Sequence, residues 1–171
     1  MVVNLIVAYC RGNGMGKNNS LPWHIPQDLK HFSKMTKGDG VKKNIIVMGR
    51  HTWESLPKKP LPHRLNVIVS NTININEENI KTVSSLRDIL TYYQSNQEIY
   101  GDLWVIGGYQ IYKEVLDNNI CDNIYITYID EIYDCDVYFP CISMDKYTLV
   151  ERYKLDNSVS IVYHYKTITN C

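Results

Sequence analysis

One carboxylate, Asp28, lies in a stretch that is otherwise rich in apolar residues and could carry acid–base chemistry. Pro26 favours the start of a helix, so we expect Asp28 in its first turn, with Leu29 and Phe32 on the same face as Ile25. A carboxylate at the edge of an apolar pocket can hydrogen-bond a flat, nitrogen-rich ring while the pocket walls contact the ring faces. The alternative is that Asp28 only complements the helix dipole, a common use of Asp in a first turn.

Two junctions between an expected strand and an expected helix have the composition of phosphate sites. At the first, Gly49 precedes Arg50 and Thr52, so free backbone N–H groups, a guanidinium and a hydroxyl meet at a helix start. At the second, Gly107 and Gly108 let a phosphate approach the backbone without interference from a Cβ. The alternative at the first is a plain strand-to-helix junction with a solvated Arg50, and at the second a glycine pair that allows tight packing. In a parallel sheet, however, both junctions would lie along one carboxyl edge. Neither standard nucleotide fingerprint occurs.

Two loops could complete such a site. Residues 10–20 carry three alternating glycines and lead into the Asp28 segment, which suits either a lid that excludes water or a disordered surface loop. In the loop 56–64, Arg64 could bind a carboxylate with two hydrogen bonds while Leu56 and Leu61 line an apolar groove. The alternative for this second loop is a solvated basic segment.

Composition excludes several classes of protein. The chain has 171 residues, enough for one domain (1–171) with a substantial core. Its 44% hydrophobic and 21% charged residues are ordinary for a soluble globular protein. The net charge is +0 without a basic stripe, so we expect neither nucleic acid nor a membrane as a partner. The apolar run at residues 1–8 lacks a charged segment before it and resembles a strand, not a signal peptide.

The cysteines and histidines indicate no metal site. The five cysteines (Cys10, Cys121, Cys135, Cys141 and Cys171) form no C-x-x-C pair and are odd in number. We therefore expect free thiols in a reducing, cytoplasmic environment. The five histidines show no metal-ligand spacing with one another or with the cysteines.

The order of the expected elements indicates an α/β protein. Apolar, β-branched runs predict strands at 3–9, 44–48, 65–69, 81–83, 103–106, 124–129, 148–154 and 160–167. Helices are predicted at 26–36, 51–56, 85–95 and 109–116, the third capped by Ser84 or Ser85. This order predicts a single-domain, mostly parallel sheet with right-handed crossovers and helices on both faces. A hairpin around Asp156, Asn157 and Ser158 makes its C-terminal edge antiparallel, and 71–79 is expected to be a polar loop.

In order along the chain, these segments resemble the dihydrofolate reductase family, and the resemblance covers essentially the whole sequence. It is carried by residues 21–23 with 28–32, and by 48–55, 60–66, 105–108 with 111–112, and 125–127. The resemblance implies an eight-stranded mixed sheet and the NADPH-dependent reduction of 7,8-dihydrofolate to 5,6,7,8-tetrahydrofolate. It also implies a place in one-carbon metabolism, in support of thymidylate and purine synthesis, and antifolate inhibitors as ligands.

The resemblance further implies a role for each matched residue. Asp28 would hydrogen-bond the pterin 2-amino group and N3, with support from Thr127. Trp23 and Leu21 would complete the set of catalytic residues, and a water that supplies the proton would enter near Trp23. The substrate would be bound by Ile6, Ala8, Leu29, Phe32, Leu56, Leu61, Arg64, Ile106 and Tyr112. The cofactor would be bound by Ala8, Gly16, Gly49, Arg50, His51, Thr52, Val69, Ser70, Asn71, Gly107, Gly108, Tyr109, Gln110 and Ile111. Arg64 would bind the α-carboxylate of the glutamate tail and Ser70 the 2′-phosphate, whereas Asn71 stands where many relatives carry a second basic or hydroxyl residue.

Two other functions fit parts of the pattern. A pterin- or pyrimidine-directed reductase with the same fold would leave Arg64 without a role. A non-catalytic folate- or nucleotide-binding module would not need Asp28, Thr127 and the lid together. The family implies a monomer, or a domain of a fusion with thymidylate synthase, as in some relatives.

Overall fold

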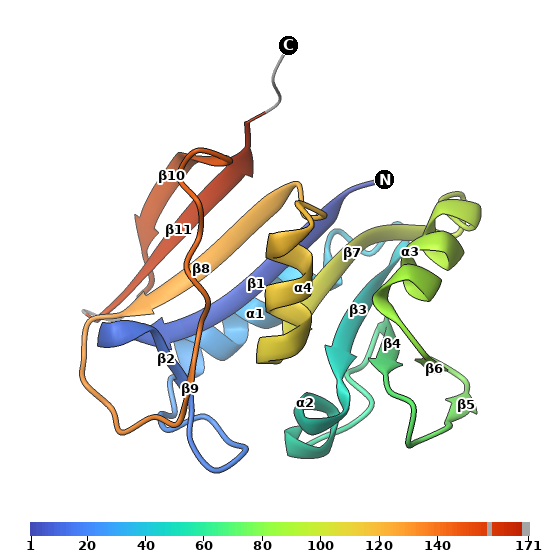
Figure 1. The fold of residues 1–171 in the computed structure, drawn as a ribbon, viewed down its shortest axis with the longest axis horizontal. Coiled ribbons are helices and arrows are strands. Elements are labelled where there is room, and N and C mark those ends of the chain that lie inside the picture. The colour runs from blue at the N-terminus through green and yellow to red at the C-terminus, as the bar shows by residue number, and fades with distance from the viewer. Residues whose placement is uncertain (157–158, 169–171) are drawn as a thin grey trace.

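The computed structural model describes residues 1–156 and 159–168 (Figure 1). Within these residues the main sheet has nine strands, in the order β10 (Tyr147–Lys154), β11 (Ser160–Thr167), β8 (Asn123–Ile129), β1 (Val3–Cys10), β7 (Tyr100–Gly107), β3 (Lys43–Gly49), β4 (Arg64–Val69), β6 (Ile80–Val83) and β5 (Asn76–Glu77). A separate two-stranded sheet joins β2 (Gly14–Gly16) to β9 (Val137–Tyr138), after a short 3-10 helix at Arg11–Asn13. The helices are α1 (Pro26–Lys37), α2 (Arg50–Ser55), α3 (Leu86–Ser95) and α4 (Tyr109–Asp117).

The predicted fold class is confirmed, with one difference in the strand count. Strands β8, β1, β7, β3, β4 and β6 pair in parallel, while β10 and β11 form an antiparallel edge beside β8. All eight predicted strands are present, but the main sheet has nine because Asn76 and Glu77 of β5 pair with Lys81 and Ile80. The prediction of a plain loop at 71–79 was therefore wrong at this pair. The predicted turn at Asn157 and Ser158 lies outside the described residues.

Both faces of the main sheet are covered, which explains why its parallel strands are continuous apolar runs. On one face, Leu103 and Val105 of β7 belong to a core that also contains Ile89 of α3 and Val115 of α4. On the other face, Trp104 belongs to a second cluster, against which side chains of α1 and α2 pack. In Figure 1, α4 lies in front of the sheet and α1 behind it.

Local signals account for the helix boundaries. Pro26 occupies the first turn of α1, and the helix ends at Gly38, whose φ of 67° suits glycine and whose N–H donates to the Lys34 carbonyl. Ser85 caps α3 by accepting a hydrogen bond from the backbone N–H of Asp88, as one of the two predicted caps.

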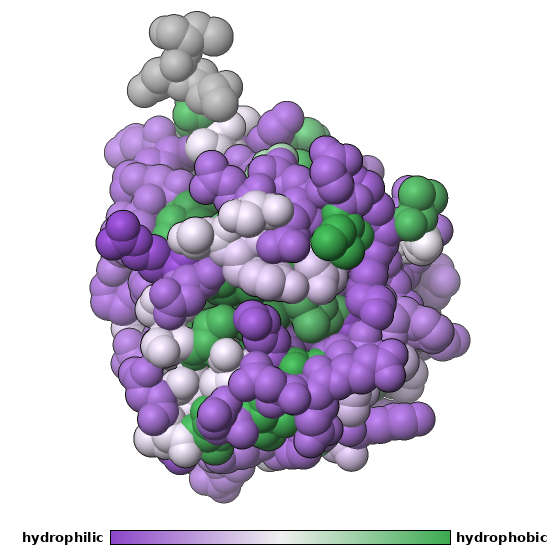
Figure 2. All heavy atoms as spheres, turned by 90° about the vertical axis from the view of Figure 1, so that its right-hand side faces the viewer, coloured by the Kyte–Doolittle hydropathy of each residue, from purple (hydrophilic) through white to green (hydrophobic). Residues whose placement is uncertain are grey.

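The surface at the β5 end of the sheet has no broad apolar area. Figure 2 shows this side with several small hydrophobic areas separated by hydrophilic side chains. None of the described helices is long and apolar enough to cross a membrane. The described residues also contain no group of three or more His, Cys, Asp or Glu side chains placed to hold a metal ion.

Candidate active site

The Asp28 carboxylate is buried in the first turn of α1, with only 8% of the residue exposed. Burial raises its pKa, and the hydroxyl of Thr127 on β8 partly opposes this by stabilising the charged form. Within the described part of the chain no cation forms an ion pair with it. Asp28 is thus a desolvated acid that can hold a proton or face a positively charged ring.

Tyr112 is a second buried polar side chain near this acid, and it is hydrogen-bonded to β1. Its side chain comes from α4, is 4% exposed, and donates a hydrogen bond of 2.7 Å to the Ile6 carbonyl. Burial raises the pKa of Tyr112, and the charge of Asp28 raises it further, so the two side chains lie within electrostatic reach. Gly107 has a φ of 121°, and a Cβ there would lie 3.2 Å from the Tyr112 hydroxyl oxygen. The structure thus brings Ile6, Gly107 and Tyr112 together.

The two glycine junctions lie next to each other at the carboxyl edge of β3 and β7, which confirms the expectation of a shared edge. A Cβ on Gly49 would lie 3.9 Å from the backbone nitrogen of Gly108. A Cβ on Gly108 would lie 3.2 Å from Oγ1 of Thr52. A side chain at position 108 would therefore crowd Thr52 and narrow the space beside the start of α2. A phosphate bridging the two junctions could therefore reach backbone N–H groups and the Thr52 hydroxyl.

The side chains of Arg50 and His51 flank these junctions but are only loosely held. Nε of Arg50 and Nδ1 of His51 each lie 3.7 Å from the carboxylate of Glu54. Ion pairs at such exposed positions contribute little, so both side chains are free to turn to an anionic ligand. Past the end of β4, Ser70 Oγ accepts a hydrogen bond from the Thr72 backbone N–H, and Asn71 is exposed.

Arg64 is a buried cation at the start of β4, with 2% of the residue exposed. Its Nε donates to the Pro62 carbonyl at 3.0 Å, and Nη1 donates to Oγ1 of Thr36 at 2.6 Å. Burial lowers its pKa, and none of the described hydrogen bonds uses its second terminal nitrogen, Nη2. The interpretation of this loop as a solvated basic segment was wrong for Arg64, because α1 supplies Thr36 to hold the guanidinium.

Asn66 was not recognised from the sequence as a residue that fixes this loop. Its side chain is fully buried and bonds both the N–H and the carbonyl of Leu61, at 2.9 and 3.0 Å. The same amide donates to the Arg64 carbonyl at 3.1 Å. The available signal was a single amide inside an apolar strand, because such a group needs internal hydrogen bonds. Asn66 thereby fixes the backbone of Leu61 and of Arg64.

The glycine-rich loop 10–20 has a defined path, held against residues 130–139. Strand β2 pairs with β9, Lys17 Nζ lies 3.0 Å from the Asp134 carboxylate, and the Asn18 N–H donates to Asp136 at 3.0 Å. The alternative of a disordered loop is therefore wrong. The partner segment was missed, since its two-residue strand carries no periodic pattern.

Exposure separates the predicted site residues into three groups. Those that are buried are Ile6, Trp23, Asp28, Arg64, Gly107, Ile111, Tyr112 and Thr127. Those that are half-buried are Ala8, Gly16, Phe32, Gly49, Arg50, Thr52, Leu56, Leu61, Val69, Ser70, Ile106 and Gly108. Those that are exposed are Leu21, Leu29, His51, Asn71, Tyr109 and Gln110. Trp23 is notable because its buried Nε1 finds no acceptor among the described residues.

Comparisons with known proteins cover nearly all of this structure. A family model described as "Dihydrofolate reductase" matches residues 2–170. The dihydrofolate reductase of Schistosoma mansoni is 40% identical over 157 residues, which are 88% of this chain and 84% of that protein. That of Aedes albopictus is 37% identical over 150 residues, 83% of this chain and 81% of that protein. The bifunctional dihydrofolate reductase-thymidylate synthase 2 of Arabidopsis thaliana is 41% identical over 153 residues, 84% of this chain but 27% of that protein.

Proposed function

The chain belongs to the dihydrofolate reductase family, and on that premise we propose that it reduces 7,8-dihydrofolate to 5,6,7,8-tetrahydrofolate with NADPH as hydride donor. The observation that carries the proposal is the buried carboxylate of Asp28, which has no ion-pair partner among the described residues, on the same helix that holds the buried guanidinium of Arg64. One ligand with a nitrogen-rich ring at one end and a carboxylate at the other would satisfy both charges.

The spacing along α1 supports this substrate. Thr36, which holds Arg64, follows Asp28 by eight residues of α1, or about 12 Å along the helix axis. Phe32 lies between them, and Leu56 and Leu61 pack against the same hydrophobic cluster. This apolar span suits the benzoyl part of a pteroylglutamate, so the ring would face Asp28 and the glutamate tail would face Arg64.

The acid group has a direct role in this proposal. Reduction of the pterin at C6 requires a proton at N5, and the negative charge of Asp28 favours the protonated ring. Asp28 would also accept hydrogen bonds from the 2-amino group and N3, with Thr127 supporting the carboxylate. The free indole N–H of Trp23 is suited to hold a water that supplies the proton. The same Asp28 contacts would bind antifolate inhibitors that carry a protonated diamino ring.

The residues at the two junctions fit a dinucleotide. The narrow space between Gly108 and Thr52, the loosely held guanidinium of Arg50 and the imidazole of His51 suit its phosphates. When bound, NADPH supplies the hydride; the protein supplies binding, alignment and exclusion of water. Arg50, with Ser70 and Asn71, is the candidate for binding the 2′-phosphate, and the lid at 10–20 would close over the reacting ends.

The direct test is to mix the protein with NADPH and dihydrofolate and to follow the loss of reduced-nicotinamide absorbance. Activity with dihydrofolate, weaker activity with NADH, and a hydride-transfer rate that rises toward acid pH would support the proposal. No turnover by the wild-type chain, or faster turnover of dihydrobiopterin than of dihydrofolate, would count against it. The proposal includes one domain, residues 1–171, acting as a cytoplasmic monomer that supplies one-carbon metabolism, which sedimentation and cell fractionation would check.

A further inference from the structure

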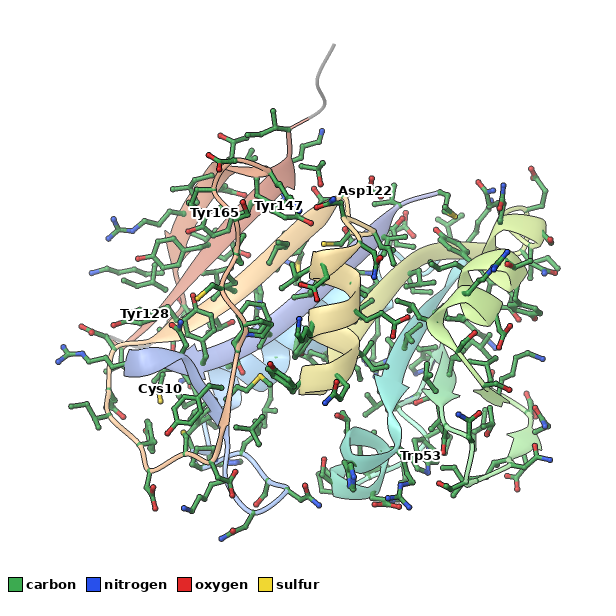
Figure 3. The ribbon with its side chains drawn as sticks, in the orientation of Figure 1. Cys10, Trp53, Asp122, Tyr128, Tyr147 and Tyr165 are labelled. Carbon is green, nitrogen blue, oxygen red and sulfur yellow. The ribbon has the colours of Figure 1, made fainter. Side chains whose placement is uncertain are left out.

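Two buried thiols meet at the base of the lid. Cys10 ends β1 and Cys135 precedes β9, and their sulfur atoms lie 3.8 Å apart although the residues are separated by 125 positions. They are 0% and 8% exposed and share a cluster with Trp23 and Ile129. Figure 3 shows Cys10 at the end of β1, where the chain enters the lid. The proposed reaction uses neither thiol.

The thiol pair touches the lid directly through Gly14 of β2. A Cβ on this glycine would lie 2.5 Å from the Cys135 sulfur and 3.1 Å from the Cys10 sulfur. The lid backbone therefore packs on both sulfur atoms, with no room for any larger residue. A change in the covalent bonding of these sulfur atoms would therefore act directly on the backbone at Gly14.

Apart from this contact, the lid is held to residues 130–139 by weak interactions. They comprise the short β2–β9 pairing, one hydrogen bond from the Asn18 N–H to Asp136, and two exposed ion pairs, Arg11 with Asp130 and Lys17 with Asp134. Three further backbone hydrogen bonds join the N–H of Arg11 to the Glu131 carbonyl, that of Asp136 to the Gly16 carbonyl, and that of Phe139 to the Asn13 carbonyl. Exposed ion pairs and two-residue strands open easily. A covalent bond at the base of the lid would add a restraint that none of these contacts supplies.

We propose that Cys10 and Cys135 are an oxidation site at which a low-molecular-weight disulfide, such as oxidised glutathione, forms an intramolecular disulfide that fastens the lid to the segment 130–139. One protein thiolate attacks the glutathione disulfide and releases one glutathione thiol, which leaves a mixed disulfide. The second protein thiol then displaces the other glutathione. The two cysteines lose two electrons and two protons in all, and the glutathione disulfide is reduced to two thiols.

Among the described cysteines, the geometry favours this pairing. A disulfide needs the sulfur atoms at about 2.05 Å, so this pair, at 3.8 Å, must approach by about 1.8 Å. Cys121 is instead bonded to the Tyr147 hydroxyl, and Cys141 is exposed. Burial, and then the contact with Cys10, raise the pKa of Cys135, so the first attack is slow in the closed lid and faster when the lid opens.

The test uses the full chain treated with oxidised glutathione and then mapped by mass spectrometry of its peptides. We expect a Cys10–Cys135 cross-link and, for the amides of Gly16 and Asn18, hydrogen exchange slowed at least about tenfold, both reversed by dithiothreitol. Cys10→Ala and Cys135→Ala should each abolish both effects, whereas Cys141→Ala, which removes an exposed thiol, should keep them. If circular dichroism shows that one alanine variant fails to fold, Cys135→Ser serves in its place.

Two results would overturn the inference. One is a stable glutathione adduct, or a cross-link through another cysteine, in place of the expected pair. The other is a Cys10–Cys135 cross-link that leaves the exchange of the lid amides unchanged. Because the readouts are peptide masses and amide exchange, they stand apart from any failure of the proposed reductase activity.

Discussion

Replacement of Arg64 by leucine tests how the substrate lies in the groove. The guanidinium is 2% exposed, held only by the Pro62 carbonyl and the Thr36 hydroxyl, and within the described residues it has no carboxylate partner. A substrate carboxylate would complete a buried, charge-assisted pair, whose loss costs about 3–4 kcal/mol of binding. Since each 1.4 kcal/mol is about tenfold in affinity, Arg64→Leu should weaken dihydrofolate binding about 100- to 1,000-fold.

The assay compares KM for dihydrofolate with KM for a dihydropterin that lacks the benzoylglutamate tail. Wild type should prefer the tailed substrate, and Arg64→Leu should lose that preference while its KM for the tail-less compound stays within about threefold. Arg87→Leu, which removes an exposed arginine on α3, is the matched control and should change neither value. Equal losses for both substrates would refute the reasoning, because they would mean that Arg64 supports the loop and not the tail.

Three further changes address the acid, the cofactor and the loop. Asp28→Asn should retain NADPH binding but slow hydride transfer at least about 100-fold at neutral pH. Burial raises the Asp28 pKa, so protonated Asp28 stabilises the folded state below the carboxyl pKa of the unfolded chain, and this stabilisation is lost as pH rises. The amide of Asp28→Asn stays neutral, so this variant should have a higher Tm than wild type at pH 7 but not near pH 3. Arg50→Ala should raise the Kd for NADPH more than that for NADH; equal increases would place the 2′-phosphate elsewhere. Asn66→Ala should cost about 2–3 kcal/mol, seen as a Tm lower by about 4–12 °C, since it leaves the N–H and carbonyl of Leu61 unpaired; an unchanged Tm would show that water replaces the amide.

The sequence predicted the elements whose causes are local. Helix α1 follows from Pro26 at its start, α3 from the Ser85 cap, and the parallel strands from apolar runs that both faces bury. Strands β2, β5 and β9 have two or three residues each, too few for a periodic pattern. Strands β2 and β9 pair because the rest of the fold brings distant segments together, whereas β5 pairs locally with β6 across Glu78 and Asn79.

The residues of the candidate site likewise divide into those that the sequence predicts and those that only the structure reveals. The burial of Asp28 and the adjacency of the two glycine junctions follow from the helix start and from the parallel sheet. The burial of Arg64 does not, because its neighbours Lys58, Lys59 and His63 are exposed and only the distant Thr36 explains its position. The contact between Cys10 and Cys135 likewise has no sequence signal.

The two buried charges, Asp28 and Arg64, have opposite signs and lie at opposite ends of the proposed substrate site. Both are desolvated, as the raised pKa of Asp28 and the lowered pKa of Arg64 indicate, and the described residues give neither an ion-pair partner of opposite sign. A ligand bound in the proposed direction presents a basic ring to the acid and a carboxylate to the cation, so it neutralises both. The reverse direction would place carboxylate against carboxylate in a site of low polarity, where like charges repel strongly. Orientation of the substrate would thus be selected by charges that the fold keeps apart along α1, before any contact with the reacting atoms is made.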